Sequence, residues 1–122
     1  TPILCVGESI EQRKKNIYKN FIMKQLTECI EGIKCEKLVV AYEPIWSIGT
    51  GIVPTVGDII EISELIFSFL KKKKIEKFKI LYGGSVNSTN FYEINSIDKI
   101  NGALIGGASL KIDEMEKILT SC

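Results

Sequence analysis

The sequence predicts an α/β fold in which parallel strands alternate with helices. Four short apolar runs alternate with segments whose apolar residues recur at helical spacing. Strands that are apolar almost throughout are typical of a parallel sheet covered by helices and joined by right-handed crossovers. A chain of 122 residues, 45% of them hydrophobic, can form one domain with a real core. We therefore expect a single domain over residues 1–122, built of four parallel strand–helix units whose strands are apolar on both faces.

The first unit begins with a predicted strand at residues 3–6, which Gly7 ends before Glu8 and Ser9. A single helix is predicted from about residue 10 to residue 33. Its apolar residues follow helical spacing, and Gly32 is a plausible stop signal. These apolar residues are Ile17, Phe21, Ile22, Leu26, Ile30 and Ile33.

The second unit carries the residue around which the rest of the chain is organised. An apolar run at residues 38–42 ends on Glu43, and Pro44 stops the strand because proline cannot donate to a ladder. Glu43 is thereby predicted at the carboxyl end of a buried strand, where α/β folds place their chemistry. The following loop, residues 44–54, contains two glycines, a tryptophan and small hydroxyls, which suits a lid over a ligand. The alternative is an ordinary strand end with a solvated glutamate.

The later elements follow the same order. Thr55 and Asp58 have capping-box spacing before a helix that continues over residues 59–70 into the lysine run 71–74, and Gly57 is an unusual residue for its first turn. A third strand is predicted at residues 78–82 and a short helix at 89–94. A fourth strand is predicted at residues 103–105, before a last helix. One face of that helix carries Ile112, Met115, Ile118 and Leu119.

Composition argues against several classes of function. The net charge of +1 gives no electrostatic footprint for nucleic acid or a membrane, and the lysine run is predicted to be a solvated helix end, with a polyanion site as the alternative. The chain has no His and no C-x-x-C pair, so we expect no metal and no cofactor. Cys5, Cys29, Cys35 and Cys122 are expected to be reduced thiols. With neither a signal peptide nor a membrane-length apolar run, we expect a cytoplasmic location, with an organelle such as the plastid as the alternative.

Glycine-rich turns end three of the predicted strand–loop segments. They are 49–51, 83–85 and 106–107, and all would lie at the carboxyl edge of the sheet. Glycines let backbone N–H groups approach a ligand closely, and a ring of such donors suits a phosphate group. Each turn alone could be no more than a tight turn. Three of them beside a strand-end glutamate favour a phosphate site.

Four motifs make the resemblance to a known family specific. In order they are residues 5–8 (CVGE), 42–51 (YEPIWSIGTG), 82–86 (YGGSV) and 106–110 (GGASL). They resemble strands five to eight of the triosephosphate isomerase family, over essentially the whole chain. A full barrel of this class needs about 250 residues. The resemblance therefore implies half of a (β/α)8 TIM barrel, which belongs to a longer protein or pairs with another chain.

The family interconverts glyceraldehyde 3-phosphate and dihydroxyacetone phosphate in glycolysis and gluconeogenesis, so the resemblance implies a triose phosphate substrate and a homodimer. It implies that Glu43 is the general base, since burial against apolar groups raises the pKa of a carboxyl group and so makes it a stronger base. Backbone donors at Gly49, Ser85, Gly106 and Gly107 would bind the phosphate. Ile48 and Leu104 would clamp over the carboxylate, and a Trp46–Glu8 hydrogen bond would mark the closed lid. The remaining lid residues implied are Pro44, Gly51 and Tyr82.

Two departures from the family qualify this expectation. The family also uses an Asn, a Lys and an electrophilic His from its first four strands, and this chain lacks those segments and has no His. In the family, the tyrosine that corresponds to Tyr82 binds a backbone N–H at the position of Pro54 when the lid closes. Proline has no N–H, so this chain cannot form that bond. We expect the chain alone to be inactive and to need the amino-terminal half of the barrel or a second copy as partner. The alternatives are a different phosphate-binding barrel enzyme, which would lack the Tyr-Glu-Pro-x-Trp lid, and an inactive half-barrel that serves in binding or assembly.

Overall fold

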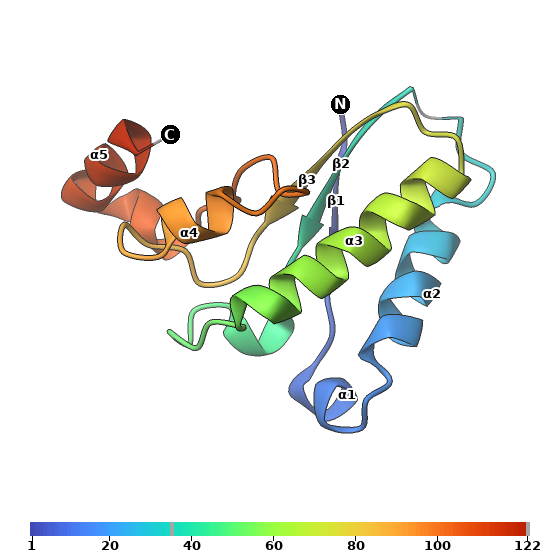
Figure 1. Cartoon of the computed structure of the whole chain (residues 1–122), viewed down its shortest axis with the longest axis horizontal. Helices are drawn as coiled ribbons and strands as arrows, with labels where there is room; N and C mark the ends of the chain where they lie inside the picture. Colours follow the sequence, from blue (N-terminus) through green and yellow to red (C-terminus); the bar gives the residue numbers. More distant parts are fainter. Residues whose placement is uncertain (35, 122) are drawn as a thin grey trace.

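The computed structural model describes residues 1–34 and 36–121 and contains a three-stranded parallel sheet (Figure 1). The strands are β1 (Ile3–Val6), β2 (Lys37–Tyr42) and β3 (Lys77–Tyr82), in the order β1-β2-β3. Val6, Tyr42 and Tyr82 lie side by side in the register, so the three strands end together. The α/β class and the parallel sheet are confirmed. Cys35 and Cys122 lie outside the described residues.

Helices follow each strand. The α-helices are α1 (Ile10–Lys14), α2 (Tyr18–Ile30), α3 (Val56–Lys72), α4 (Phe91–Asn95) and α5 (Ile112–Thr120). Two short 3-10 helices, η1 (Ile45–Ser47) and η2 (Gly107–Leu110), begin the loops after β2 and after the last extended segment. None of the helices in the described part of the chain is both long and apolar enough to cross a membrane.

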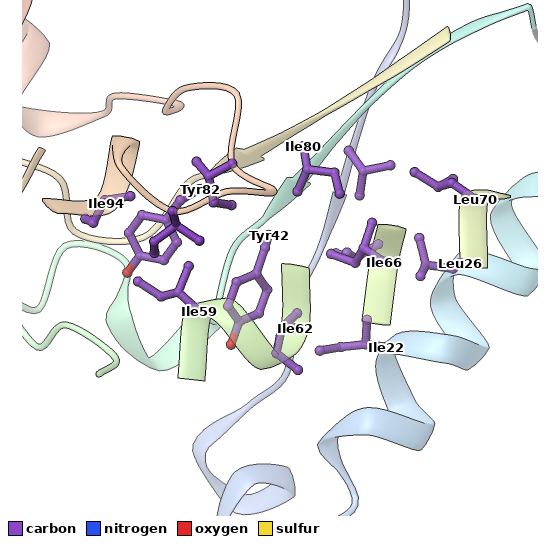
Figure 2. Packing of buried hydrophobic residues seen from close by; sticks show 14 of the residues in the cluster. Ile22, Leu26, Tyr42, Ile59, Ile62, Ile66, Leu70, Ile80, Tyr82 and Ile94 are labelled. Atoms are coloured by element: carbon purple, nitrogen blue, oxygen red, sulfur yellow. The ribbon is translucent and has the colours of Figure 1, made fainter. Parts of the chain in front are cut away.

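The core lies between the sheet and the helices α2 and α3. Figure 2 shows Ile22 and Leu26 of α2 next to Ile66 of α3. Ile80 of β3 lies above them and Tyr42 of β2 lies to their left. All five side chains are buried. Because alternate strand residues face opposite sides of a sheet, the neighbours of these strand residues point away from this core.

The opposite face of the sheet is only partly apolar. Ile3 and Cys5 are exposed there and Leu81 is half-buried, as the sequence predicted for a face that lines a barrel. Lys79 shares this face and is exposed, since β3 alternates polar and apolar residues up to Ile80. The expectation that every strand is apolar on both faces is therefore wrong for β3.

The single helix predicted over residues 10–33 is divided in two. Asn16 has a φ of 55°, a left-handed conformation that asparagine tolerates better than most residues, and it separates α1 from α2. The Ile17 N–H donates to the Gln12 carbonyl at 3.1 Å across this break. Gly32 has a φ of 72° two residues beyond the end of α2, which agrees with its predicted role as a stop signal.

The fourth strand, predicted at residues 103–105, forms only an isolated parallel bridge between Ala103 and Tyr82. The Asn101 side chain accepts the Ile80 N–H at 2.9 Å, in place of a backbone carbonyl of a neighbouring strand. Gly102 follows with a φ of 144°, a backbone conformation outside the strand region. This segment therefore runs beside β3 without a regular ladder.

The two later helices differ in how well they match their predictions. α3 begins at the predicted capping box, in which Thr55 Oγ1 accepts the Asp58 N–H at 3.2 Å and Asp58 accepts the Thr55 N–H at 3.0 Å. It ends in exposed lysines, as expected for a solvated helix end. α5 contacts mainly η2, so Ile112 and Leu119 of its predicted apolar face are exposed and Ile118 is buried.

We expect Gly57→Ala to raise the free energy of unfolding by about 0.5–1 kcal/mol, because alanine is the better helix former. A methyl group at this position would meet only the Thr55 hydroxyl, at 3.8 Å. The matched control is Gly32→Ala, which should lower stability by about 1–2 kcal/mol because a side chain disfavours the left-handed conformation there. Urea denaturation at one chain concentration measures the free energy of unfolding of both variants. A change of the same sign in both would contradict the assignment of Gly57 to the helix and of Gly32 to a left-handed turn.

Candidate active site

The carboxyl ends of the three strands are tied together by hydrogen bonds that continue past the ladder. The Glu43 N–H donates to the Val6 carbonyl at 2.7 Å, and the Gly83 N–H donates to the Tyr42 carbonyl at 2.8 Å. The Leu104 N–H donates to the Tyr82 carbonyl at 2.8 Å. The residues that follow each strand are thereby brought to one edge of the sheet.

Two glycines allow Glu43 to occupy this edge. A Cβ atom on Gly7 would lie 1.7 Å from the Glu43 carbonyl oxygen, so no side chain fits beside the Glu43 backbone. A Cβ atom on Gly83 would lie 2.6 Å from Glu43 Cγ and 2.9 Å from its Oε1. The Glu43 side chain therefore packs directly on the backbone of the turn after β3. Gly7 thus leaves room for the Glu43 backbone, and Gly83 leaves room for its carboxylate.

Eight of the predicted site residues line one pocket of about 750 Å³ at this edge. They are Glu43, Ile48, Gly49, Gly51, Ser85, Leu104, Gly106 and Gly107. Glu43 and Leu104 are half-buried, whereas Ile48 is 49% exposed. The lid side chain predicted to clamp the carboxylate thus stands away from the apolar core. The predicted residues that do not line the pocket are Pro44, Trp46, Tyr82 and Glu8.

Glu8 is fully buried and accepts hydrogen bonds from one predicted lid residue, Trp46, and from Tyr42 at the end of β2. Its Oε1 accepts the Trp46 indole N–H at 3.1 Å and the Tyr42 hydroxyl at 3.1 Å. The Trp46–Glu8 contact predicted by the resemblance is therefore present. Burial, and next the Glu8 charge, raise the pKa of the Tyr42 hydroxyl well above its usual range. Tyr42 consequently stays protonated and remains a donor to Glu8.

Arg13 of α1 extends this network and was missed by the sequence analysis. Its Nη1 lies 3.7 Å from Glu8 Oε1, and its Nη2 lies 2.5 Å from Oδ1 of Asp58. The guanidinium carbon also lies 4.1 Å from the centre of the Tyr18 ring. Arg13 thereby joins the Glu8 carboxylate to Asp58, the third residue of α3 and part of its capping box. A basic residue one turn into α1 was the only available sequence signal, and it does not indicate its partners.

Ser47 was also missed, although it belongs to the lid. Its Oγ donates to the Ile52 carbonyl at 2.6 Å, lies 3.3 Å from the Tyr82 hydroxyl and accepts the Ser85 N–H at 3.2 Å. We call these four residues the lid–turn cluster. Burial raises the pKa of the Tyr82 hydroxyl, so it too stays protonated. Pro54 is buried and has no N–H, and Tyr82 meets the lid through Ser47 instead.

The Cys5 thiol is a further neighbour of Glu43, the candidate base. Partial burial, then the charge of Glu43 and a hydrogen bond to it, raise the pKa of the Cys5 thiol. Cys5 and Cys29 are free and exposed. Among residues 1–34 and 36–121, no three His, Cys, Asp or Glu side chains are grouped so as to hold a metal ion.

Parallel strands covered by helices, with a carboxylate and glycine-rich turns at their carboxyl ends, make this chain part of a (β/α)8 barrel. The family model described as triosephosphate isomerase matches residues 1–122. The chain belongs to the triosephosphate isomerase family.

Relatives support this assignment and show how much of the barrel is present. A triosephosphate isomerase of Bradyrhizobium sp. (strain ORS 278) is 43% identical over 98% of this chain and 49% of its own length. That of Mycoplasmopsis agalactiae is 42% identical, with 98% and 45% covered. That of Francisella tularensis subsp. holarctica is 41% identical, with 98% and 49% covered. The chain spans about half the length of the curated relatives it matches.

We expect Glu8→Leu to shift the fluorescence emission of Trp46, the only tryptophan of the chain, to longer wavelength. The indole N–H and the Tyr42 hydroxyl would lose their buried acceptor, and each unmet group costs about 1–3 kcal/mol. Glu8→Gln is the matched control because it retains an acceptor oxygen. The same spectrum for the Leu variant and the unmodified chain would show that Glu8 does not hold Trp46.

Proposed function

We propose that this chain is the carboxyl-terminal half of a triose-phosphate isomerase that interconverts glyceraldehyde 3-phosphate and dihydroxyacetone phosphate. The observation that carries the proposal is the pocket that brings the Glu43 carboxylate together with Gly49, Ser85, Gly106 and Gly107. Its relatives bear the name of this enzyme. The activity would serve glycolysis and gluconeogenesis, and the exposed free thiols of Cys5 and Cys29 suit a reducing cytoplasm.

In the proposed reaction, Glu43 removes a proton from one carbon of the triose phosphate and returns it to the adjacent carbon. The carbonyl oxygen and the neighbouring hydroxyl exchange roles, so the substrate is neither oxidised nor reduced overall. The half-buried position of Glu43 beside the Gly83 backbone limits the water around the carboxylate. Leu104, also half-buried, supplies an apolar wall of the same pocket.

The phosphate group would be bound by backbone donors at the glycine-rich turns. Gly106 and Gly107 are exposed, and a Cβ atom added to either glycine would meet no other atom within 4 Å, so the backbone there is open to a ligand. Backbone N–H groups bind phosphate without a cationic side chain. Anchoring the phosphate at this turn places the carbon chain of a triose toward Glu43 across the pocket.

The proposed partner of the chain is the first half of the barrel. The face of the sheet away from α2 and α3 exposes Ile3 and Cys5, and β1 lies at the edge of the sheet. The reaction also needs a group that polarises the substrate carbonyl, and the chain contains no His for this role. This absence favours the second candidate function, an inactive binding or assembly module, for the chain taken alone. The assembled barrel would form the homodimer that we expect.

In the intact protein, we expect Glu43→Gln to lower kcat by roughly 10²–10⁴-fold, the usual contribution of a general base. Leu104→Ala should lower kcat less, by admitting water to the carboxylate. The control is Glu11→Gln on α1, which is exposed and outside the pocket. Steady-state isomerase assays measure all three variants. Unchanged turnover in Glu43→Gln would remove Glu43 from the mechanism.

We expect the 122-residue chain alone to self-associate and to show no isomerase turnover. Unpaired strand edges and an exposed apolar face favour association, and two copies would still lack the polarising group. Mixing the chain with the first half of the Bradyrhizobium relative should give heterodimers with turnover. Sedimentation velocity and the assay test both statements. A compact monomer would contradict the first, and turnover by the chain alone would contradict the second.

A further inference from the structure

The lid–turn cluster engages both hydrogen-bond donors of Ser85, a residue that the proposed function needs for phosphate. The Ser85 N–H donates to Ser47 Oγ at 3.2 Å, and Ser85 Oγ donates to the Ser47 carbonyl at 2.5 Å. The Ser85 carbonyl accepts the Asn90 side-chain amide at 2.9 Å. In this arrangement Ser85 has no donor left for an anion, although it lines the pocket.

The position of the protons in the cluster follows from counting donors. A serine hydroxyl has one proton, and Ser47 donates it to the Ile52 carbonyl, its shortest contact at 2.6 Å. Ser47 Oγ is therefore an acceptor toward the Ser85 N–H and toward the Tyr82 hydroxyl at 3.3 Å. One oxygen thus joins the beginning of the lid, its far side and the turn after β3.

The turn is shaped around these hydroxyl groups. A Cβ atom on Gly84 would lie 2.1 Å from the Tyr82 hydroxyl oxygen and 2.8 Å from Ser47 Oγ, so a side chain there would displace both. Ser47 and Tyr82 are both fully buried. A buried hydroxyl with all of its partners in place is a specific contact and not an incidental one on the surface.

We propose that Ser47 is a positioning residue whose hydroxyl competes with the substrate phosphate for the Ser85 N–H. The inference rests on the proposed function, because it takes Ser85 to be a phosphate donor. A phosphate oxygen replaces Ser47 Oγ as the acceptor of the Ser85 N–H. Ser47 leaves the turn after β3 once the Ser85 hydroxyl also releases the Ser47 carbonyl, while the bond from Ser47 to Ile52 remains within the lid. Phosphate binding and movement of the lid are therefore coupled through the two hydrogen-bond donors of Ser85.

The test is calorimetric titration of the intact protein, containing both halves of the barrel, with inorganic phosphate. Ser47→Ala removes the competing acceptor, so we expect phosphate to bind roughly two- to tenfold more tightly, the equivalent of one neutral hydrogen bond. The matched control is Ser63→Ala, which removes a buried hydroxyl that donates to the Ile60 carbonyl at 2.9 Å within α3. Its phosphate affinity should equal that of the unmodified protein.

The sign of the change separates competition from a merely structural role. If Ser47 only stabilises the turn, Ser47→Ala binds phosphate equally or more weakly, and that result overturns the inference. Should the variant fail to fold, the NMR resonance of the Ser85 amide in the unmodified protein tests the inference. This resonance shifts at saturating phosphate if its acceptor changes, and an unchanged resonance overturns the inference. Calorimetry does not need turnover, so an inactive protein that still shows tighter phosphate binding in Ser47→Ala would refute the proposed reaction alone.

Discussion

The buried carboxylate of Glu8 is the interaction on which the carboxyl edge of the sheet depends. Removing a charge from water costs several kcal/mol unless partners replace the solvent. Here Tyr42 donates from β2, Trp46 donates from the lid, and Arg13 approaches from α1. Arg13 in turn pairs with Asp58 at the start of α3. A single charge therefore requires four segments to keep their relative positions.

Most of the candidate site could be predicted because its residues follow strands. Parallel strands end at one edge, so Glu43, Gly83 and Gly106 were expected together as soon as the strands were recognised. Their residue types reinforced the prediction, since Pro44 ends β2 and the glycines leave backbone exposed. The predicted fourth strand failed because a polar side chain replaces a backbone partner there. Asn101 takes the place of a ladder carbonyl, and no hydrophobic pattern reveals such a substitution.

The residues that the sequence did not indicate act through distant polar contacts. Ser47 and Ser85 are separated by 38 positions, and Arg13 and Asp58 belong to different units of the fold. Residues with hydroxyl or guanidinium groups do not recur at regular spacing in the sequence, so their partners become evident only when the chain is folded. The Trp46–Glu8 contact was predicted from family resemblance alone. Burial of Glu8 gives it a physical reason, because an indole N–H and a carboxylate each need a partner in the interior.

The lid–turn cluster suggests how a half-barrel with so few charged pocket residues could respond to an anion. A neutral hydrogen bond contributes about 0.5–1.5 kcal/mol, whereas one to a charged group contributes about 1.5–3 kcal/mol. Replacing Ser47 Oγ by a phosphate oxygen at the Ser85 N–H therefore favours the anion by roughly 1–1.5 kcal/mol. In the proposed mechanism, this difference is large enough to bias the lid and small enough for the bond to reverse when the phosphate leaves. A stronger donor such as lysine at the same place would bind phosphate whether or not the lid moved, so the weakness of the exchanged bond is what couples the two events.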